Sequence, residues 1–270
     1  MKNTNLKPII ESYNIDEEFL YDKTYLFIKG YSVGRNLTYT LKALPLARKV
    51  HNGQYRQGTM LVESPLGDGT MIERKIPYVL HVLKVCSTLI SLNLPLTNEE
   101  LDILTSSALL HDVIEDAEDG LFKNGGHELV TEYGFPEEVY TIVKLLSKRS
   151  GSTKEELNAY FNEIKKNKFA LLIKMADRSH NVEDLYTMKL ERLHRYVEET
   201  RNYVYPLSKY AKANYPELSN GVTILKAKII SLTEATETIV NIYEDVILSK
   251  NNEIEELKKQ LQKKNEEIKH

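Results

Sequence analysis

Apolar residues recur at helical spacing along most of the chain, which predicts a protein built almost entirely of α-helices. In the first such segment, Leu41, Leu44, Ala47 and Val50 follow this spacing, and Pro45 predicts a helix start or a kink. No stretch alternates apolar and polar residues for long enough to indicate a large sheet. The pattern predicts further helices over residues 76–93, 97–115, 137–146, 154–165, 168–185, 190–210 and 222–248.

Local turn and capping signals add detail to this helical pattern. Thr97 with Glu100 three residues later forms a capping box, which predicts a helix start. Residues 64–70 are rich in turn-forming residues and are flanked by two short apolar runs. That combination predicts a small β-hairpin or a loop between otherwise helical segments.

The two ends of the chain differ from its middle. Residues 1–36 are aromatic and mixed in charge, which predicts an N-terminal arm, while residues 37–240 form one domain and residues 241–270 form a C-terminal helix or short coiled coil. Seven residues of this last part and of its approach keep heptad a and d spacing: Val240, Tyr243, Ile247, Ile254, Leu257, Leu261 and Ile268. Lys250 and Lys264 interrupt the d positions, so a charged helix that frays in solvent is an equal alternative.

Composition and charge narrow the class of protein. The chain has 270 residues, 41% of them hydrophobic, and a net charge of −3, so no overall basic field favours nucleic acid as a partner. No apolar run approaches the roughly 20 residues that span a membrane, and the polar N-terminus does not resemble a signal peptide. The single cysteine, Cys86, lies in an apolar run and is expected to be buried and structural. We therefore expect a cytoplasmic protein.

The chemistry is concentrated around residues 111–116. On one continuous helix His111 and Glu115 are four residues apart, as are Asp112 and Asp116, so each pair would share a face. Three neighbouring carboxylates repel one another unless a proton or a cation lies among them, and a divalent metal suits such a set. The alternative is an acidic helix end that is simply solvated.

Two more residues are candidate metal ligands. His81 lies in an otherwise apolar helical stretch, where a core histidine with satisfied hydrogen bonds is the alternative. Asp177 follows a mostly apolar run, and burying its carboxylate is costly unless it pairs with Arg178 or another neighbour, or binds a metal.

The ordered motifs together resemble the HD-domain metal-dependent phosphohydrolases, and among them the RelA/SpoT-type alarmone hydrolases. The matching strings are HNGQYR (51–56), PYVLH (77–81), ALLHDVIED (108–116), IKMADRSHN (173–181) and ETRNYVYPL (199–207). The resemblance covers roughly residues 37–239 and implies an all-α HD-domain helical bundle. Around that bundle we expect the hairpin or loop insertion and the long C-terminal helix.

The resemblance also implies an activity and assigns roles to residues. The family hydrolyses the 3′-pyrophosphate of guanosine tetra- or pentaphosphate, ppGpp or pppGpp, with Mn²⁺, although another divalent metal would suit the same ligands. Metal ligands would be His81, His111, Asp112 and Asp177. Catalytic carboxylates would be Glu115 and Asp116. Substrate contacts would be Arg56, Gln57 and Asn181.

Three features depart from the family pattern, all of them on the substrate side. Residues 60–74 form an insertion, Gln57 replaces a basic residue, and Asp184 replaces a threonine. Two alternatives therefore stay open: an HD phosphatase that acts on another nucleotide, such as NADPH or a nucleoside phosphate, and a non-catalytic metal- or nucleotide-binding module. We further expect that a homo-oligomer could form through the C-terminal helix.

Overall fold

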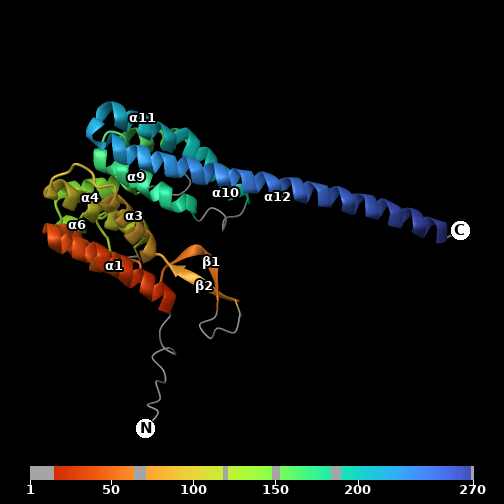
Figure 1. Cartoon of the computed structure of the whole chain (residues 1–270), viewed down its shortest axis with the longest axis horizontal. Helices are drawn as coiled ribbons and strands as arrows, with labels where there is room; N and C mark the ends of the chain where they lie inside the picture. The colour runs from red at the N-terminus through yellow and green to blue at the C-terminus, as the bar shows by residue number, and fades with distance from the viewer. Residues whose placement is uncertain (1–14, 64–70, 118–120, 148–152, 184–189, 269–270) are drawn as a thin grey trace, which may run out of the picture.

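The computed structural model describes residues 15–268 except 64–70, 118–120, 148–152 and 184–189. In this part of the chain, helices form a bundle, one hairpin projects from it, and the last helix extends far beyond it (Figure 1). The long helices are α1 (Ile15–Arg35), α2 (Thr38–Val50), α3 (Val79–Ser91), α4 (Asn98–Leu110), α7 (Glu137–Leu146), α8 (Lys154–Ile164), α9 (Lys168–Asn181), α10 (Leu190–Glu199), α11 (Tyr205–Asn214) and α12 (Ser219–Ile268). Shorter elements are α5 (Val113–Asp116), α6 (Glu128–Thr131), the π-helix η2 (Thr200–Val204) and the 3₁₀-helix η3 (Pro216–Leu218). The predicted all-α fold is confirmed.

Helix α4 lies at the centre of the bundle and contacts α2, α3, α7 and α9. Every side chain from Leu101 to Leu110 is buried, as expected for a helix that is covered on all sides. The predicted capping box is present: Thr97 Oγ1 accepts a hydrogen bond from the Glu100 amide, and Glu100 Oε2 accepts one from the Thr97 amide. This cap fixes where the helix that leads to His111 begins.

A buried carboxylate from α4 completes the start of α2. Asp102 accepts hydrogen bonds from the backbone amides of Tyr39 and Thr40, at 2.9 and 2.7 Å. These amides belong to the first turn of α2, where helix N–H groups lack a partner within the helix. The negative charge also meets the positive end of the helix dipole, so Asp102 joins α2 firmly to the central helix.

The predicted insertion is a β-hairpin. Strand β1 (Tyr55–Glu63) pairs antiparallel with β2 (Met71–Pro77), with Val62 opposite Ile72 and an irregularity between Tyr55 and Thr59. The hairpin projects from the bundle near α3 (Figure 1). Its base carries Arg56 and leads through Pro77 directly into α3, so the hairpin adjoins the predicted site.

Several helix boundaries differ from those predicted. The helix expected over 97–115 is two helices, because α4 ends at Leu110 and α5 starts at Val113. The helix expected over 190–210 contains the π-helical turn η2 and is divided there. Residues 222–248 and the tail form one continuous helix, α12. Hydrophobic periodicity shows which face of a helix is buried, whereas these breaks depend on contacts between helices.

The N-terminal segment contributes to the hydrophobic core of the bundle. Its described part is the helix α1, which packs against α2 and α3, and Ile28 is fully buried in the same hydrophobic core as the rest of the bundle. The C-terminal boundary predicted at residue 240 falls inside α12, which runs without a break. The proposed domain division remains a prediction, but the described backbone provides no linker at either boundary.

Candidate metal centre

Four predicted ligands from three parts of the chain converge within the bundle. His81 belongs to α3, His111 follows the last residue of α4, Asp112 precedes α5, and Asp177 lies on α9. His81, His111 and Asp177 are buried, and Asp112 is mostly buried. Packing of α3 against α4 and α9 brings these side chains together.

His81, His111 and Asp177 offer ligand atoms that all lie within 4.8 Å of one another, and Asp112 lies close to both histidines. His81 Nε2 lies 3.1 Å from Asp177 Oδ1 and 3.7 Å from Asp112 Oδ2. His111 Nε2 lies 3.1 Å from Asp112 Oδ2 and 3.9 Å from Asp177 Oδ1. Ligands placed ~2.1 Å from a tetrahedral ion would be ~3.4 Å apart. The observed spacing is close to that value on every one of these four edges.

The hydrogen bonding of His111 prepares it to bind a metal. Its Nδ1 lies 2.8 Å from the Ala108 carbonyl oxygen, which can only accept, so Nδ1 carries the proton. Its Nε2 is buried, faces the cluster and has no hydrogen-bond partner. A neutral histidine held in this way presents a lone pair to the ion, the usual arrangement for a metal ligand. These residues therefore fit a divalent metal ion.

The two aspartates are held in their ionised form. Burial opposes ionisation of Asp177, but Lys174, with Nζ 3.1 Å from Asp177 Oδ2, and then His81 keep the pKa of Asp177 well below its usual range. Burial likewise opposes ionisation of Asp112, but His111 lowers the pKa of Asp112. Tyr78 donates a hydrogen bond to Asp112 Oδ2 at 2.7 Å. Both carboxylates can therefore act as anionic ligands.

The histidines respond oppositely to this environment. Burial lowers the pKa of His81. Burial also disfavours the charged form of His111, but Asp112 and then Asp177 outweigh it and raise the pKa of His111 to about 9. In the absence of an ion, His111 is thus the group that takes up a proton to balance the two carboxylates.

The break between α4 and α5 changes the directions in which the side chains of His111 and Asp112 point. Neighbouring residues on a continuous helix point about 100° apart, so His111 and Asp112 could not both face one point. The backbone leaves the helix at Asp112, with φ −104° and ψ −3°, and α5 restarts when the amides of Glu115 and Asp116 bond to the Asp112 carbonyl. The expected single helix face is wrong, and the break allows two adjacent ligands.

The predicted catalytic carboxylates lie on α5 beside the ligands. Glu115 is exposed, whereas Asp116 is partly buried and its Oδ2 has no hydrogen-bond partner. Burial, and then the charges of Asp112 and Glu115, raise the pKa of Asp116 to about 6. A carboxyl with that pKa can exchange a proton near neutral pH.

His51 and Gln54 support this part of the site. Gln54 Nε2 donates to the Asp116 carbonyl oxygen at 2.6 Å, and Gln54 Oε1 lies 2.8 Å from His51 Nδ1. The His51 ring also packs against Tyr78, which in turn bonds Asp112. Through these contacts the HNGQYR string supports both Asp112 and Asp116.

The predicted substrate residues meet at the edge of the cluster. Arg56 Nη2 donates to Asn181 Oδ1 at 2.7 Å, and Asn181 Nδ2 donates to Asp177 Oδ1 at 2.5 Å. Arg56 Nη1 also lies 2.6 Å from His81 Nδ1. The side chain of Gln57 and all of Asp184 lie outside the described residues.

Two buried residues that contact the metal ligands, His180 and Lys174, were not among the site residues predicted from the sequence. The Nδ1 atoms of His180 and His81 are 2.7 Å apart, so one of them donates a proton to the other, and burial lowers the pKa of His180 to about 2. Arg56 Nη1, which can only donate, lies 2.6 Å from His81 Nδ1 and 3.1 Å from His180 Nδ1. His81 Nε2 faces the cluster, 3.1 Å from Asp177 Oδ1. Lys174 was also missed. Both lie three residues from Asp177 on α9, a spacing that could have revealed them.

Arg178 has a separate, structural role. It pairs with Glu199 at 2.5 Å, donates to Thr200 Oγ1 at 2.9 Å, and lies over the Tyr196 ring. The carboxylate that pairs with Arg178 is therefore that of Glu199, whereas Asp177 pairs with Lys174. This side chain ties α9 to the π-helical turn and not to the metal ligands.

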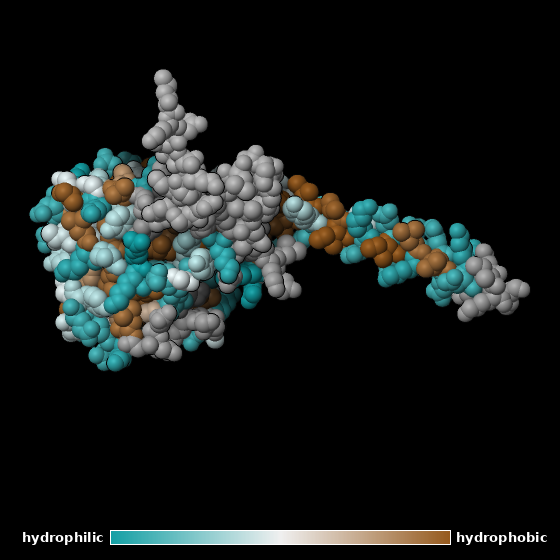
Figure 2. All heavy atoms as spheres, turned by 90° about the horizontal axis from the view of Figure 1, so that it is seen from below, coloured by the Kyte–Doolittle hydropathy of each residue, from teal (hydrophilic) through white to brown (hydrophobic). Residues whose placement is uncertain are grey.

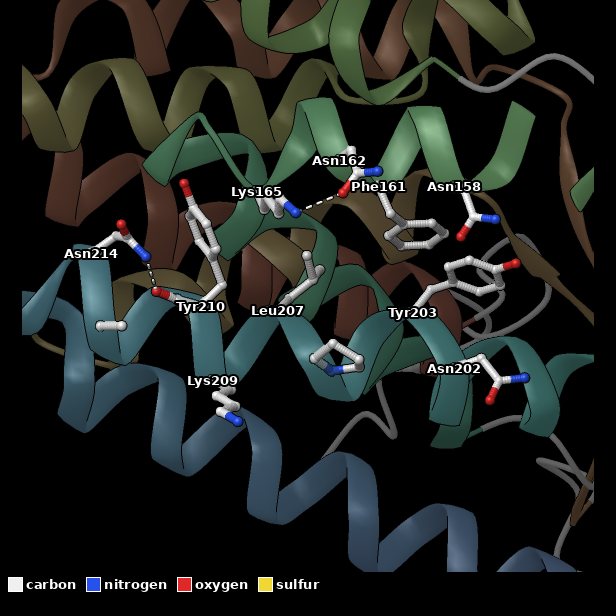
Figure 3. A pocket seen from close by; sticks show the side chains of 12 residues that line it. Asn158, Phe161, Asn162, Lys165, Asn202, Tyr203, Leu207, Lys209, Tyr210 and Asn214 are labelled. Atoms are coloured by element: carbon white, nitrogen blue, oxygen red, sulfur yellow. Dashed lines mark hydrogen bonds between the residues drawn. The ribbon is translucent and has the colours of Figure 1, made fainter. Parts of the chain in front are cut away.

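A pocket outside the metal centre lies between α8 and α11 (Figure 3). Its volume is about 420 Å³, and its floor includes Leu207 and the stacked rings of Phe161 and Tyr203. Two lysines, Lys165 and Lys209, and several asparagines line its rim, but no histidine or carboxylate does. It therefore offers neither metal ligands nor a general base, and none of the predicted site residues lines it.

The chain resembles known proteins both in sequence and in fold. The chain is 29% identical over 210 residues to a protein of Oryza sativa subsp. japonica described as "Putative GTP diphosphokinase RSH1, chloroplastic". The match covers 74% of this chain and 21% of the rice protein, so the chain spans about a fifth of the length of that relative. No family model matches the chain.

A solved structure shares the fold. Its description reads "A metazoan ortholog of SpoT hydrolyzes ppGpp and plays a role in starvation responses". The match has a TM-score of 0.51 and 22% identity, and covers 74% of this chain and 96% of that chain. The first comparison confirms the resemblance to RelA/SpoT-type proteins, and the second shows a shared helical fold. Among the described residues, no helix is both long and apolar enough to cross a membrane.

Proposed function

We propose that this protein is a Mn²⁺-dependent hydrolase that removes the 3′-pyrophosphate from ppGpp or pppGpp. The observation that carries the proposal is the convergence of His81, His111, Asp112 and Asp177 beside the carboxyl of Asp116. A site that only binds a nucleotide needs no base beside its metal. The ppGpp hydrolysis named for the metazoan structure, on the same fold, supports the choice of substrate.

In the proposed reaction, the oxygen of a water molecule attacks the phosphorus that is bonded to the 3′ oxygen. The bond between that phosphorus and the 3′ oxygen breaks, the water gives a proton to a carboxylate, and the 3′ oxygen leaves with a proton. The products from ppGpp are pyrophosphate and GDP. A bound metal ion would acidify the water and neutralise charge on the phosphoryl oxygens.

The chain's own residues would position the water and the substrate. Asp116, with a pKa of about 6, would take the proton, and exposed Glu115 would help to orient the water. Arg56 and Asn181 would contact the nucleotide from the edge of the cluster, where their side chains already meet. Gln57, at the base of the hairpin, would contribute to base recognition.

A cytoplasmic location remains our prediction, and cell fractionation would test it.

A nucleotide panel tests the proposal. The full chain is incubated with Mn²⁺ and ppGpp, pppGpp, NADPH or nucleoside phosphates, and pyrophosphate and phosphate are measured separately. We expect pyrophosphate from ppGpp and pppGpp. His111→Ala should lose bound metal and activity together, whereas Glu115→Ala should keep the metal and lose rate.

The same panel separates the alternatives. Phosphate released from NADPH or a nucleoside phosphate, without pyrophosphate from ppGpp, would show an HD phosphatase with another substrate. Metal bound with no turnover of any nucleotide would show a binding module. Replacing Mn²⁺ with Mg²⁺, Zn²⁺ or Fe²⁺ at equal concentration tests the metal, because His and carboxylate ligands suit several ions.

A further inference from the structure

The second half of α12 leaves the bundle. Its first part packs against α9 and α11, with Val222 and Leu225 buried. Val240 is the last buried residue, and it packs with Leu193 and Val197 of α10. From Asn241 to Asn265 every side chain is exposed, and the helix continues for about 42 Å beyond Val240 at 1.5 Å per residue (Figure 1). Because the side chain of Val240 already packs against α10, the exposed part of the heptad pattern begins at Tyr243.

An apolar stripe runs along this projecting helix. At 100° per residue, its members fall within an arc about 100° wide. The exposed residues of the stripe are Tyr243, Val246, Ile247, Ile254, Leu257 and Leu261. Hydrophobic side chains interrupt the polar surface along the helix in Figure 2. A lone helix gains no tertiary packing and is of marginal stability in water, so this stripe needs a covering surface.

The residues of the stripe suit a second copy of the same helix. Ile247 and Ile254 occupy heptad a positions and Leu257 a d position, the combination that favours two strands. Lys250 occupies another d position. Its Nζ donates a hydrogen bond to Glu253 Oε2 at 2.7 Å, and this carboxylate neutralises the lysine charge at the edge of the interface between the two helices. In a two-stranded seam such a lysine can reach solvent, whereas a larger bundle would enclose it.

The flanking charges favour a parallel arrangement. In a parallel, in-register pair, a residue at g faces the residue five positions later on the partner. Glu253 occupies g and Lys258 occupies e, so each Glu253 would face Lys258 of the other copy, twice by symmetry. The other g and e pairs in this register bring no like charges together. We propose that two copies of this chain pair through α12 from Tyr243 onward as a parallel, two-stranded coiled coil.

Mass measurement of the full chain with matched variants tests the pairing. Light scattering at tens of micromolar should give twice the chain mass of 31.1 kDa. Leu257→Glu, in the stripe and 56% exposed, should give a monomer. Leu248→Glu is the control, since Leu248 is 61% exposed but lies outside the stripe, and it should leave the dimer intact. A monomeric wild type, or equal dissociation by both variants, would overturn the proposal.

Two further variants test the orientation. Leu261→Cys should form a disulfide with its own counterpart in a parallel pair, and the native Cys86 cannot compete because it is fully buried. Glu253→Lys should weaken the dimer, and adding Lys258→Glu should restore it. If the dimer forms no disulfide through Leu261→Cys, and adding Lys258→Glu to Glu253→Lys does not restore the dimer, the two helices are not parallel and in register. The hydrolase assay is independent of these measurements, so either proposal can fail alone.

Discussion

Lys174 and Asp177 lie one turn apart on α9, and the lysine Nζ is 3.1 Å from Asp177 Oδ2. Both side chains are mostly buried, so the lysine compensates the negative charge of a carboxylate that also faces the proposed ion. In the metal-free protein Lys174 does most to lower the pKa of that carboxylate. When a metal ion binds, it supplies positive charge to the same group.

This relationship predicts an unequal effect of Lys174→Met. Removing one member of a buried ion pair leaves the other uncompensated, which costs about 3–5 kcal/mol. The metal-free variant should therefore lose stability by up to that amount, while the metal-bound variant loses much less. Thermal unfolding with Mn²⁺ and with a chelator measures both. The exposed Lys259→Met should change neither, and an equal loss in both states would contradict a shared role at Asp177.

The pKa of His111 predicts how metal affinity depends on pH. That pKa is raised from 6.5 to about 9 in the metal-free fold, so an ion must displace a proton to bind. Affinity for Mn²⁺ should rise as the pH rises toward 9, by up to about tenfold per pH unit. Calorimetry in buffers of different ionisation enthalpy should detect about one released proton per ion near pH 7. Affinity that does not change between pH 6.5 and 8 would exclude this competition.

The same pKa shift predicts the opposite trend for the metal-free protein. A group with a pKa raised on folding stabilises the fold below its unfolded value, here 6.5, and this stabilisation is lost as the pH rises through 9. The free energy of unfolding in chelator should therefore fall across that window. His111→Gln should remove this part of the pH dependence, and an unchanged slope would assign it to another group.

The sequence was sufficient to predict those features of the structure that depend on a few neighbouring residues. The capping box at Thr97 and the helix over 137–146 were predicted correctly. Of the two alternatives predicted for the insertion, the structure has the β-hairpin, whose strands lie on either side of the undescribed residues 64–70. The order of His81, His111–Asp112 and Asp177 also identified residues that the structure brings together. Such signals depend on neighbouring residues or on an ordered motif, both of which are readable from the chain.

What the sequence did not reveal depends on contacts between distant residues. The helix break at Asp112 has no glycine or proline to mark it, and helical periodicity continues through it. His180 and Lys174 look like ordinary members of α9 until α3 and the hairpin place His81 and Arg56 beside His180. Val240 satisfies a heptad pattern but is covered by α10. In each case tertiary packing decided among local possibilities.

Asp116 should control the rate without controlling metal binding. Its pKa is raised to about 6, so the fraction ready to accept a proton rises as the pH increases through 6. The hydrolysis rate should follow that rise and level off above about pH 7. Asp116→Asn should bind metal normally and lose about 10²–10⁴-fold in rate, the usual contribution of a general base. The exposed Glu138→Gln is the control, and an unchanged rate in Asp116→Asn would assign the base to another residue.

Gly126 is expected to set the position of α5 through Ile114. It has a φ of 92°, and a Cβ added there would lie 2.6 Å from Ile114 Cγ1, next to Glu115. Gly125 also has a positive φ, of 63°, but an added Cβ would meet only the flexible end of Lys144, at 3.2 Å. Both Gly→Ala changes should cost about 1–2 kcal/mol for the backbone conformation. Only Gly126→Ala should add about 1–3 kcal/mol from overpacking and shift the carboxylates of Glu115 and Asp116.

Stability and activity measured together test this role of Gly126. Gly126→Ala should lower the hydrolysis rate at saturating Mn²⁺, whereas Gly125→Ala should keep it. Because the clash is with one side chain, combining Gly126→Ala with Ile114→Ala should recover part of both losses, a non-additive result expected only for residues in contact. If the double variant is simply the sum of its parts, the Ile114 contact does not position α5.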